Sequence, residues 1–263
     1  LIYRKLGRGY MITKIILLCM AGFLASFVDS IAGGGGLISV PAFMLAGLPP
    51  HMVLGTNKFS ATAGSFTSSL QFIKSGKANF KLLKYLIPFT FIGSILGVKA
   101  VLHIDQKFLN TLVLILIMFI GIYTLFSKSL GLEDKFQGLT KKNVIIGVIL
   151  ALFLGFYDGF FGPGTGSFLV FGFISIFGFS FVTSSANARI LNFVSNITAL
   201  ILFALSGKIN YMIGLPVAVS MIIGAKMGTI VALNKGSKLI KPIFVTMSLA
   251  VALKMLTGLF KYL

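Results

Sequence analysis

Charged side chains are scarce in this sequence. Only 11% of the 263 residues are Asp, Glu, Lys or Arg, whereas a soluble globular domain has about 25%. These charged residues are too few to cover the surface of a water-soluble domain. Acidic residues are the rarest, with five against 23 Lys and Arg. The single cysteine, Cys19, excludes an internal disulfide and a cysteine metal cluster, and the two histidines have no spacing that suggests zinc binding or catalysis.

Long apolar runs take the place of charge. Hydrophobic residues make up 57% of the chain, the mean hydropathy is +1.01, and several runs exceed the roughly 18 residues typical of a membrane span. Because backbone N–H and C=O groups inside lipid must pair within the protein, these runs predict helices. We expect an all-α polytopic membrane protein of the cell membrane (a bacterial inner or plasma membrane), with about eight transmembrane helices at 14–32, 52–73, 82–102, 108–127, 143–160, 182–206, 210–232 and 239–260.

Two shorter apolar pieces, 37–48 and 167–178, follow glycine-rich breaks. A helix of about twelve residues is roughly 18 Å long, well short of the ~30 Å hydrocarbon core of a bilayer. We therefore interpret these pieces as half-helices that begin inside the membrane.

The sequence repeats itself at a nearly constant spacing. An Asp followed by four glycines (29–36) returns as an Asp followed by Gly-Pro-Gly-Thr-Gly (158–166), and Ser-Gly-Lys at 75–77 returns at 206–208, almost equally far along the chain. This predicts two homologous repeats, which are typical of transporters. The chain then divides into a basic N-terminal segment (1–13), a first membrane repeat (14–127), an inter-repeat loop (128–142) and a second membrane repeat (143–263). The basic segment and the apolar run after it resemble a signal peptide, but without a cleavage site they predict a retained first helix.

The relative direction of the repeats depends on the half-helices. If each half-helix continues through the bilayer, each half crosses the membrane four times, the repeats are parallel, and Lys and Arg concentrate on the N-terminal side. If each half-helix folds back, the repeats are inverted and the charge bias nearly vanishes. The positive-inside rule favours the first arrangement, with both termini in the cytoplasm.

The two glycine-rich breaks are the first candidate site. Non-helical backbone at membrane depth is tolerated where it is buried in protein or lines a watery cavity. A half-helix that begins there presents free N–H groups and the positive end of its dipole, a geometry that binds anions. Asp29 and Asp158 lie within predicted spans just before the breaks, and an intramembrane acid is a functional candidate. They could couple transport to protons, or accept hydrogen bonds and pair with a nearby cation.

Two cations follow the half-helices at corresponding positions. Lys58 and Arg189 have the same separation along the chain as the two Ser-Gly-Lys motifs. Arginine offers an oxyanion a planar fork of donors, while lysine acts as a point charge. Because a polar stripe lies beneath each cation, contact with an anion is favoured over snorkelling to the membrane surface. The stripes are Thr62, Ser65 and Ser69 for Lys58, and Ser185, Asn192 and Asn196 for Arg189.

These segments resemble the sulfite exporter TauE/SafE family. The resemblance rests on Asp-Ser-Ile-Ala-Gly-Gly-Gly-Gly-Leu-Ile-Ser-Val-Pro at 29–41, Gly-Thr-Asn-Lys at 55–58, Gly-Phe-Tyr-Asp-Gly-Phe-Phe-Gly-Pro-Gly-Thr-Gly-Ser at 155–167 and Asn-Ala-Arg at 187–189. It covers residues 15 to 260, nearly the whole chain. It implies a permease that exports sulfite or small organosulfur anions such as sulfonates, which meet the glycine turns and the nearby Lys and Arg of both halves.

We therefore expect a transporter that binds its anion between two repeats, through helix N-termini, Lys and Arg side chains, and hydroxyl or amide groups. The candidate substrate-binding residues are Gly33, Gly34, Gly35, Gly36, Thr56, Asn57, Lys58, Gly162, Gly164, Thr165, Gly166, Asn187, Arg189 and Asn192. Asp29 and Asp158 are candidates for coupling, and the main alternative is a proton- or cation-coupled carrier of another small solute that uses them. A channel would share this composition, whereas no nucleophile, base or metal set suggests an intramembrane enzyme.

The expected partners are the small anion and membrane lipid. The net charge of +18 would suggest nucleic acid for a soluble protein. Here the cations cluster in short loops, where they orient the chain and meet anionic headgroups, so nucleic acid is not expected. The sequence predicts no metal and no cofactor, and it leaves open a homodimer.

Overall fold

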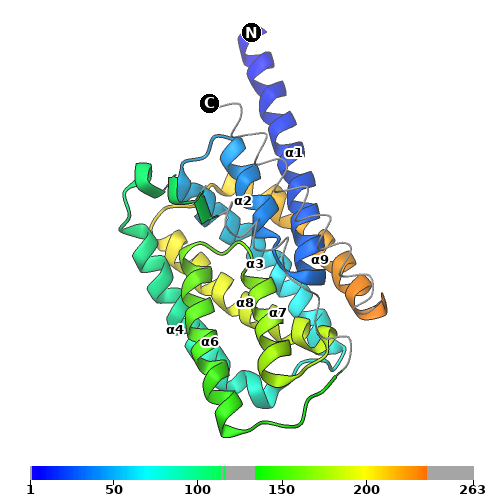
Figure 1. Cartoon of the computed structure of the whole chain (residues 1–263). Coiled ribbons are helices and arrows are strands. Elements are labelled where there is room, and N and C mark those ends of the chain that lie inside the picture. Colours follow the sequence, from blue (N-terminus) through cyan, green and yellow to red (C-terminus); the bar gives the residue numbers. More distant parts are fainter. Residues whose placement is uncertain (1, 110, 114, 117–133, 236–263) are drawn as a thin grey trace.

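The structure, a computed structural model, describes residues 2–109, 111–113, 115–116 and 134–235, and the regular elements in this part of the chain are all helices (Figure 1). Each predicted helix that falls within these ranges is confirmed. Most of the predicted span 108–127 and all of 239–260 lie outside the described residues. The helices are α1 (Ile2–Ala32), α2 (Gly36–Leu45), α3 (Pro50–Lys74), α4 (Phe80–Leu102), α6 (Lys141–Phe160), α7 (Thr165–Phe177), α8 (Phe181–Leu205) and α9 (Tyr211–Lys235).

Five of these helices, α1, α4, α6, α8 and α9, are long and apolar enough to cross a membrane. The helices α2 and α7 have 10 and 13 residues, as half-helices should. Helix α3 has 25 residues, but eight of its thirteen buried residues are polar or charged. It is therefore surrounded by other helices, which satisfy polar groups that lipid could not.

Helix α4 packs closely along α6. Gly93 and Gly97 of α4 lie against the backbone of Leu152 and Phe156 of α6, so closely that a Cβ on either glycine would overlap a carbonyl oxygen. Small residues allow this approach between membrane helices. The residue numbers of the contacts increase together on both helices, so α4 and α6 are parallel.

Helix α9 packs along α1 in the same way. Gly224 and Gly228 of α9 lie against the backbone of Phe23 and Phe27 of α1. The order of these contacts makes α1 and α9 parallel. Gly93, Gly97, Gly224 and Gly228 therefore each occupy a point of backbone contact between two helices.

Hydrogen bonds fix the direction of α3 relative to α9. Ser60 donates to the carbonyl of Gly214 at 3.0 Å, and the hydroxyl oxygens of Ser68 and Thr229 are 2.8 Å apart. Both positions advance together, so α3 is parallel to α9 and hence to α1.

Helix α8 runs opposite to α3. The Nζ of Lys58 donates to Asn196 at 3.0 Å, and Ser69 donates to the carbonyl of Arg189 at 2.9 Å. The residue number of the contact on α8 decreases as the residue number on α3 increases, so the two helices are antiparallel.

Helix α4 runs with α8. The Asn79 amide donates to Asn187 Oδ1 at 2.9 Å at the start of α4, and Ser94 donates to the carbonyl of Ser195 at 2.9 Å further along. The described long helices therefore form two sets, with α1, α3 and α9 in one direction and α4, α6 and α8 in the other.

These directions overturn the predicted course of the half-helices. Because α1 and α3 are parallel, α2 must turn back between them, and α7 likewise turns back between α6 and α8 (Figure 1). The expectation that each half-helix continues through the bilayer, with parallel repeats, is wrong, since α6 also runs opposite to α1. The charge count misled because lysines occupy both ends of the helices: Lys74, Lys77, Lys81, Lys141 and Lys142 at one end, and Lys14, Lys99, Lys107 and Lys208 at the other.

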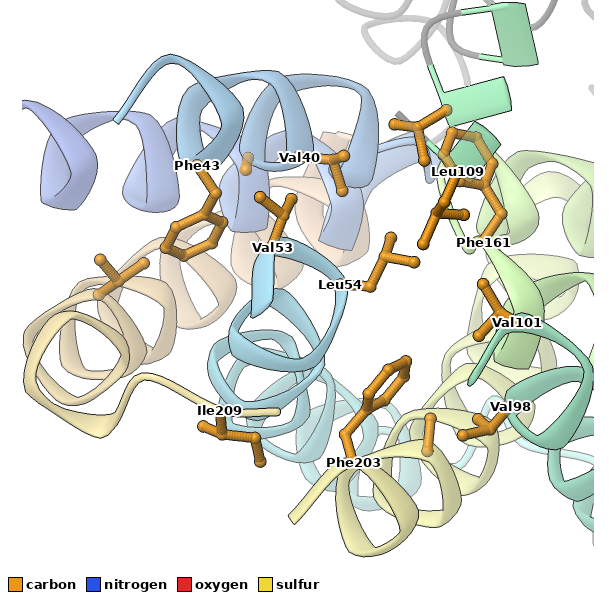
Figure 2. Packing of buried hydrophobic residues seen from close by; sticks show 14 of the residues in the cluster. Val40, Phe43, Val53, Leu54, Val98, Val101, Leu109, Phe161, Phe203 and Ile209 are labelled. Carbon is orange, nitrogen blue, oxygen red and sulfur yellow. The ribbon is translucent and has the colours of Figure 1, made fainter. Parts of the chain in front are cut away.

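An apolar core holds α2 in place. Val40 and Phe43 of α2 pack with Val53 and Leu54 of α3, and Phe203 of α8 belongs to the same cluster (Figure 2). All five are at most 2% exposed. Close packing of this kind resists movement of single side chains, so the N-terminus of the half-helix is held at a fixed place inside the protein.

Candidate functional site

Two ion pairs, one of them buried on both sides, join helices that are far apart in the chain. Lys58 Nζ is 2.9 Å from Asp158 Oδ1, and Arg189 Nη1 donates to Asp29 Oδ2. Each pair joins a residue before the connection 128–142 to a residue after it. The two pairs therefore tie α3 to α6 and α1 to α8.

Polar side chains of α8 surround the first pair. Asp158 accepts a hydrogen bond from Ser195 and a long one, 3.5 Å, from Asn192. Lys58 donates to Asn196 at 3.0 Å, and Asn196 donates to Asn192 at 3.2 Å. Asp158 is 1% exposed, so this network replaces water for a carboxylate in the protein interior.

The second pair is more accessible. The Asp29 side chain keeps 25% of its surface exposed, while Arg189 keeps 1%. Besides the guanidinium, Asp29 Oδ1 accepts a hydrogen bond from the backbone N–H of Gly35 at 3.0 Å. The carboxylate of α1 therefore caps the start of α2.

The two glycine-rich breaks lie against each other. A Cβ on Gly33, which has a φ of +85°, would overlap the backbone nitrogen of Ser167, and a Cβ on Gly36 would come within 2.9 Å of the Pro163 Cα. Ser167 also donates to the carbonyl of Ala32 at 3.2 Å. The glycines thus allow the backbones of two half-helix starts to meet.

The positive ends of two helix dipoles converge at this point. The first N–H groups of a helix have no partner within it, and the dipole adds about half an elementary charge at each N-terminus. The charged side chains of the two ion pairs cancel one another, so the dipoles of α2 and α7 leave the centre electropositive. Such a place favours an anion.

A cavity opens beside the ion pairs. Its volume is about 40 Å³, enough for roughly two or three water molecules. Most of its wall is polar. The wall consists of Ala25, Ser26, Asp29, Gly35, Gly36, Ser39, Asn57, Lys58, Ala61, Ser65, Asp158, Gly162, Gly164, Gly166, Asn192, Asn196 and Met221.

A family model described as sulfite exporter TauE/SafE matches residues 18–255. The chain belongs to the TauE/SafE family. A Haemophilus influenzae protein is 41% identical over 240 residues, which cover 91% of this chain and 93% of the relative. YfcA of Escherichia coli K12 is 38% identical over 94% of this chain and 92% of its own length. YunE of Bacillus subtilis is 26% identical over 84% of this chain and 89% of its own length. All three are named probable membrane transporter proteins, and no solved structure matches significantly.

This TauE/SafE protein is accordingly a multi-pass membrane protein of a transporter family. Ten of the predicted site residues lie in the wall of the cavity: Asp29, Gly35, Gly36, Asn57, Lys58, Asp158, Gly162, Gly164, Gly166 and Asn192. In the described part of the chain, no cluster of His, Cys, Asp and Glu could hold a metal ion.

Other predicted residues of this TauE/SafE protein lie beside the cavity. Thr56 Oγ1 accepts a hydrogen bond at 2.9 Å from the Asn210 amide at the start of α9, as Asn187 does from Asn79 at the start of α4. These two side chains therefore fasten turns between helices. The remaining four, Gly33, Gly34, Thr165 and Arg189, belong to the breaks and to the second ion pair.

Sequence reasoning missed two polar side chains of the cavity wall, Ser26 and Ser39, and left Ser65 and Asn196 without an assigned role. Ser39 was not singled out, because it sits in an apolar half-helix, yet it donates to Asn57 Oδ1 at 2.6 Å and lines the cavity. Asn196 was placed on the polar face of α8 but given no role, and it is a partner of Lys58. Its helical spacing from Arg189 was the signal that could have identified it.

Proposed function

We propose that this TauE/SafE protein exports sulfite or a small organosulfur anion. The observation that carries the proposal is the convergence of two half-helix N-termini and Lys58 around one polar cavity, with Arg189 paired to Asp29 of the cavity wall. Helix N-termini and cations are the groups that bind anionic substrates in transporters with broken helices. Oxyanions of sulfur suit this site because their several oxygens can accept from backbone N–H groups and cations together.

We also propose that the halves, 14–127 and 143–263 with the connection 128–142, are inverted repeats, and that the full chain has about eight spans. The crossed ion pairs support the repeat. Asp29 corresponds to Asp158, and Lys58 to Arg189, at nearly the same offset along the chain. Each acid pairs with the cation of the other half. The paired glycine contacts of α4 with α6 and of α9 with α1 support the repeat as well.

An anion bound between inverted halves can be exposed to either side in turn. Rocking of one half against the other around a fixed site is the usual route in such folds. The crossed ion pairs would then be the contacts that change, since they join the two halves at the cavity wall.

Thermal unfolding in detergent with added anions tests the proposal. The anions are sulfite, sulfate, thiosulfate, methanesulfonate and phosphate. A ligand that binds only the folded protein raises the melting temperature, by an amount that grows with its concentration. We expect selective stabilisation by the sulfur anions, lost in Lys58→Gln and in Arg189→Gln. Lys226→Gln is the matched control, because Lys226 is an exposed lysine of α9.

A carrier of another solute, coupled through Asp29 and Asp158, is the second candidate. It is favoured by the presence of both carboxylates in the cavity wall. Stabilisation by a cation but by none of the sulfur anions, lost in Asp29→Asn, would select this candidate and contradict the export of sulfur anions.

A further inference from the structure

Arg189 has more hydrogen-bond donors than partners. It is 1% exposed, and its Nη1 is bound to Asp29. Its Nε and Nη2 are buried without a hydrogen-bond partner among the described residues. Buried donors are nearly always satisfied, and unsatisfied ones at a charged group need an explanation. The Nη2 lies against Gly166 in the first turn of α7, so a spare donor of the guanidinium lies beside the N-terminus of that helix.

The two carboxylates differ in how firmly they are held. Asp158 has Lys58, Ser195 and Asn192 as donors, and only 2% of its side chain is exposed. Asp29 is bound by Arg189 and one backbone N–H, and 25% of its side chain is exposed. Asp29 is therefore the carboxylate that a proton and a ligand can reach.

Charge balance then links the anion to a proton. Besides Asp29, the charged groups around the site are Lys58 of α3, Asp158 of α6 and Arg189 of α8, while α2 and α7 have no charged residue and Lys226 of α9 is exposed. Each cation already has a carboxylate partner. An entering anion can therefore pair with the full positive charge of a cation only if that cation's carboxylate partner becomes neutral.

We propose that Asp29 takes up a proton when the anion binds, and that the oxyanion takes the place of its carboxylate on Arg189. The proton comes from water and is held on a carboxyl oxygen of Asp29. An oxyanion with several oxygens also supplies acceptors for Nε and Nη2, which one carboxylate oxygen leaves unpaired. This coupling rests on the proposed function and adds that a proton and an anion move together.

The coupling has a consequence for the driving force. A monovalent anion that moves with one proton carries no net charge, so the membrane voltage does not act on the transported complex. The direction then follows the two concentration gradients, and export requires an outward anion gradient larger than the opposing proton gradient. This differs from export of a bare anion, which a negative interior would drive.

Uptake of methanesulfonate into liposomes that contain the wild-type protein tests the coupling. Methanesulfonate stays ionised and monovalent, so pH does not change the probe. With the voltage clamped at zero, an interior one pH unit more alkaline should drive about tenfold accumulation, the ratio for one proton per anion. A potassium diffusion potential without a pH difference should drive none. Uptake that follows the voltage and ignores the pH difference would overturn the coupling while leaving anion transport established.

Variants locate the proton. In Asp29→Asn the pH-driven accumulation ratio should fall to one, whereas Asp105→Asn, the same change at an exposed acid outside the cavity, should behave as wild type. Persistence of pH-driven accumulation in Asp29→Asn would refute the assignment. If the wild-type protein moves neither methanesulfonate nor sulfite under any gradient, the proposed function fails and the coupling fails with it. The wild-type measurement decides the matter even if Asp29→Asn does not fold.

Discussion

The two ion pairs occupy corresponding places but should contribute very differently to stability. The Lys58–Asp158 pair is buried on both sides, with 3% and 2% of the side chains exposed, whereas the Arg189–Asp29 pair has a 25% exposed carboxylate. We predict that replacing Lys58 by Met destabilises the protein far more than replacing Arg189 by Met. Met is close in size to both side chains, so the lost charge is the main change.

The magnitudes follow from what each replacement leaves behind. Lys58→Met leaves the Asp158 carboxylate buried without a cation, which costs about 3–5 kcal/mol, or roughly 6–20 °C in melting temperature for a chain of this size. Arg189→Met leaves Asp29, which reaches water and keeps the amide of Gly35. It also removes two unpartnered nitrogens, whose burial costs about 1–3 kcal/mol each. We therefore expect a net loss below about 2 kcal/mol.

Far-UV circular dichroism during heating in detergent measures both variants. It suits this chain because the sequence contains no tryptophan and tryptophan fluorescence is not available as a signal. The double variant Lys58→Met/Asp158→Asn has no buried charge at this pair and should recover at least half of the loss. Equal losses in the two single Met variants, or a larger loss for Arg189→Met, would refute the reasoning from burial.

Three further predictions concern the break, a cap and the topology. A Cβ in Gly166→Ala would overlap Arg189 Nη2, so the dissociation constant for methanesulfonate, measured by thermal shift, should rise by at least about tenfold; an unchanged constant would place the anion elsewhere. Thr140→Ala removes the capping box of α6 and should cost about 1 kcal/mol of stability without changing anion transport. In a cysteine-free background, Lys77→Cys and Lys208→Cys lie in exposed turns at opposite ends of the helices, so an impermeant thiol reagent should label them from opposite sides of the membrane. Labelling of both from one side would contradict the helix directions.

Much of the fold was predictable from the sequence because hydropathy reports lipid contact directly. The half-helices were also predictable, since runs of glycine and proline break a helix wherever they stand. The direction of the half-helices was not. It depends on contacts such as Gly93 with Leu152 and Ser60 with Gly214, which join residues far apart in the chain. Counting Lys and Arg on each side of the membrane could not replace those contacts. The side to which each loop is assigned already depends on whether the half-helix crosses the bilayer or turns back.

The candidate site was predictable in its charged members and less so in its neutral ones. Charges inside apolar runs are costly, so Asp29, Asp158, Lys58 and Arg189 were evident from the sequence. Their pairing across the halves was not evident, because a sequence shows that a carboxylate needs a partner but not which cation supplies it. The role of Ser39 could not be predicted for a similar reason. A serine hydroxyl can form its hydrogen bond within its own helix, so the sequence does not show that it faces a site.

Sulfite flux through liposomes containing the purified protein tests the central claim most directly. The comparison is between the wild-type protein, the double variant Lys58→Gln/Arg189→Gln and the control Lys226→Gln, each below its melting temperature and with its helical content verified. We predict saturable sulfite flux in the wild-type protein and in Lys226→Gln, and flux no greater than that of protein-free liposomes in the double variant. Undiminished sulfite flux in the double variant would contradict an anion site built on these two cations.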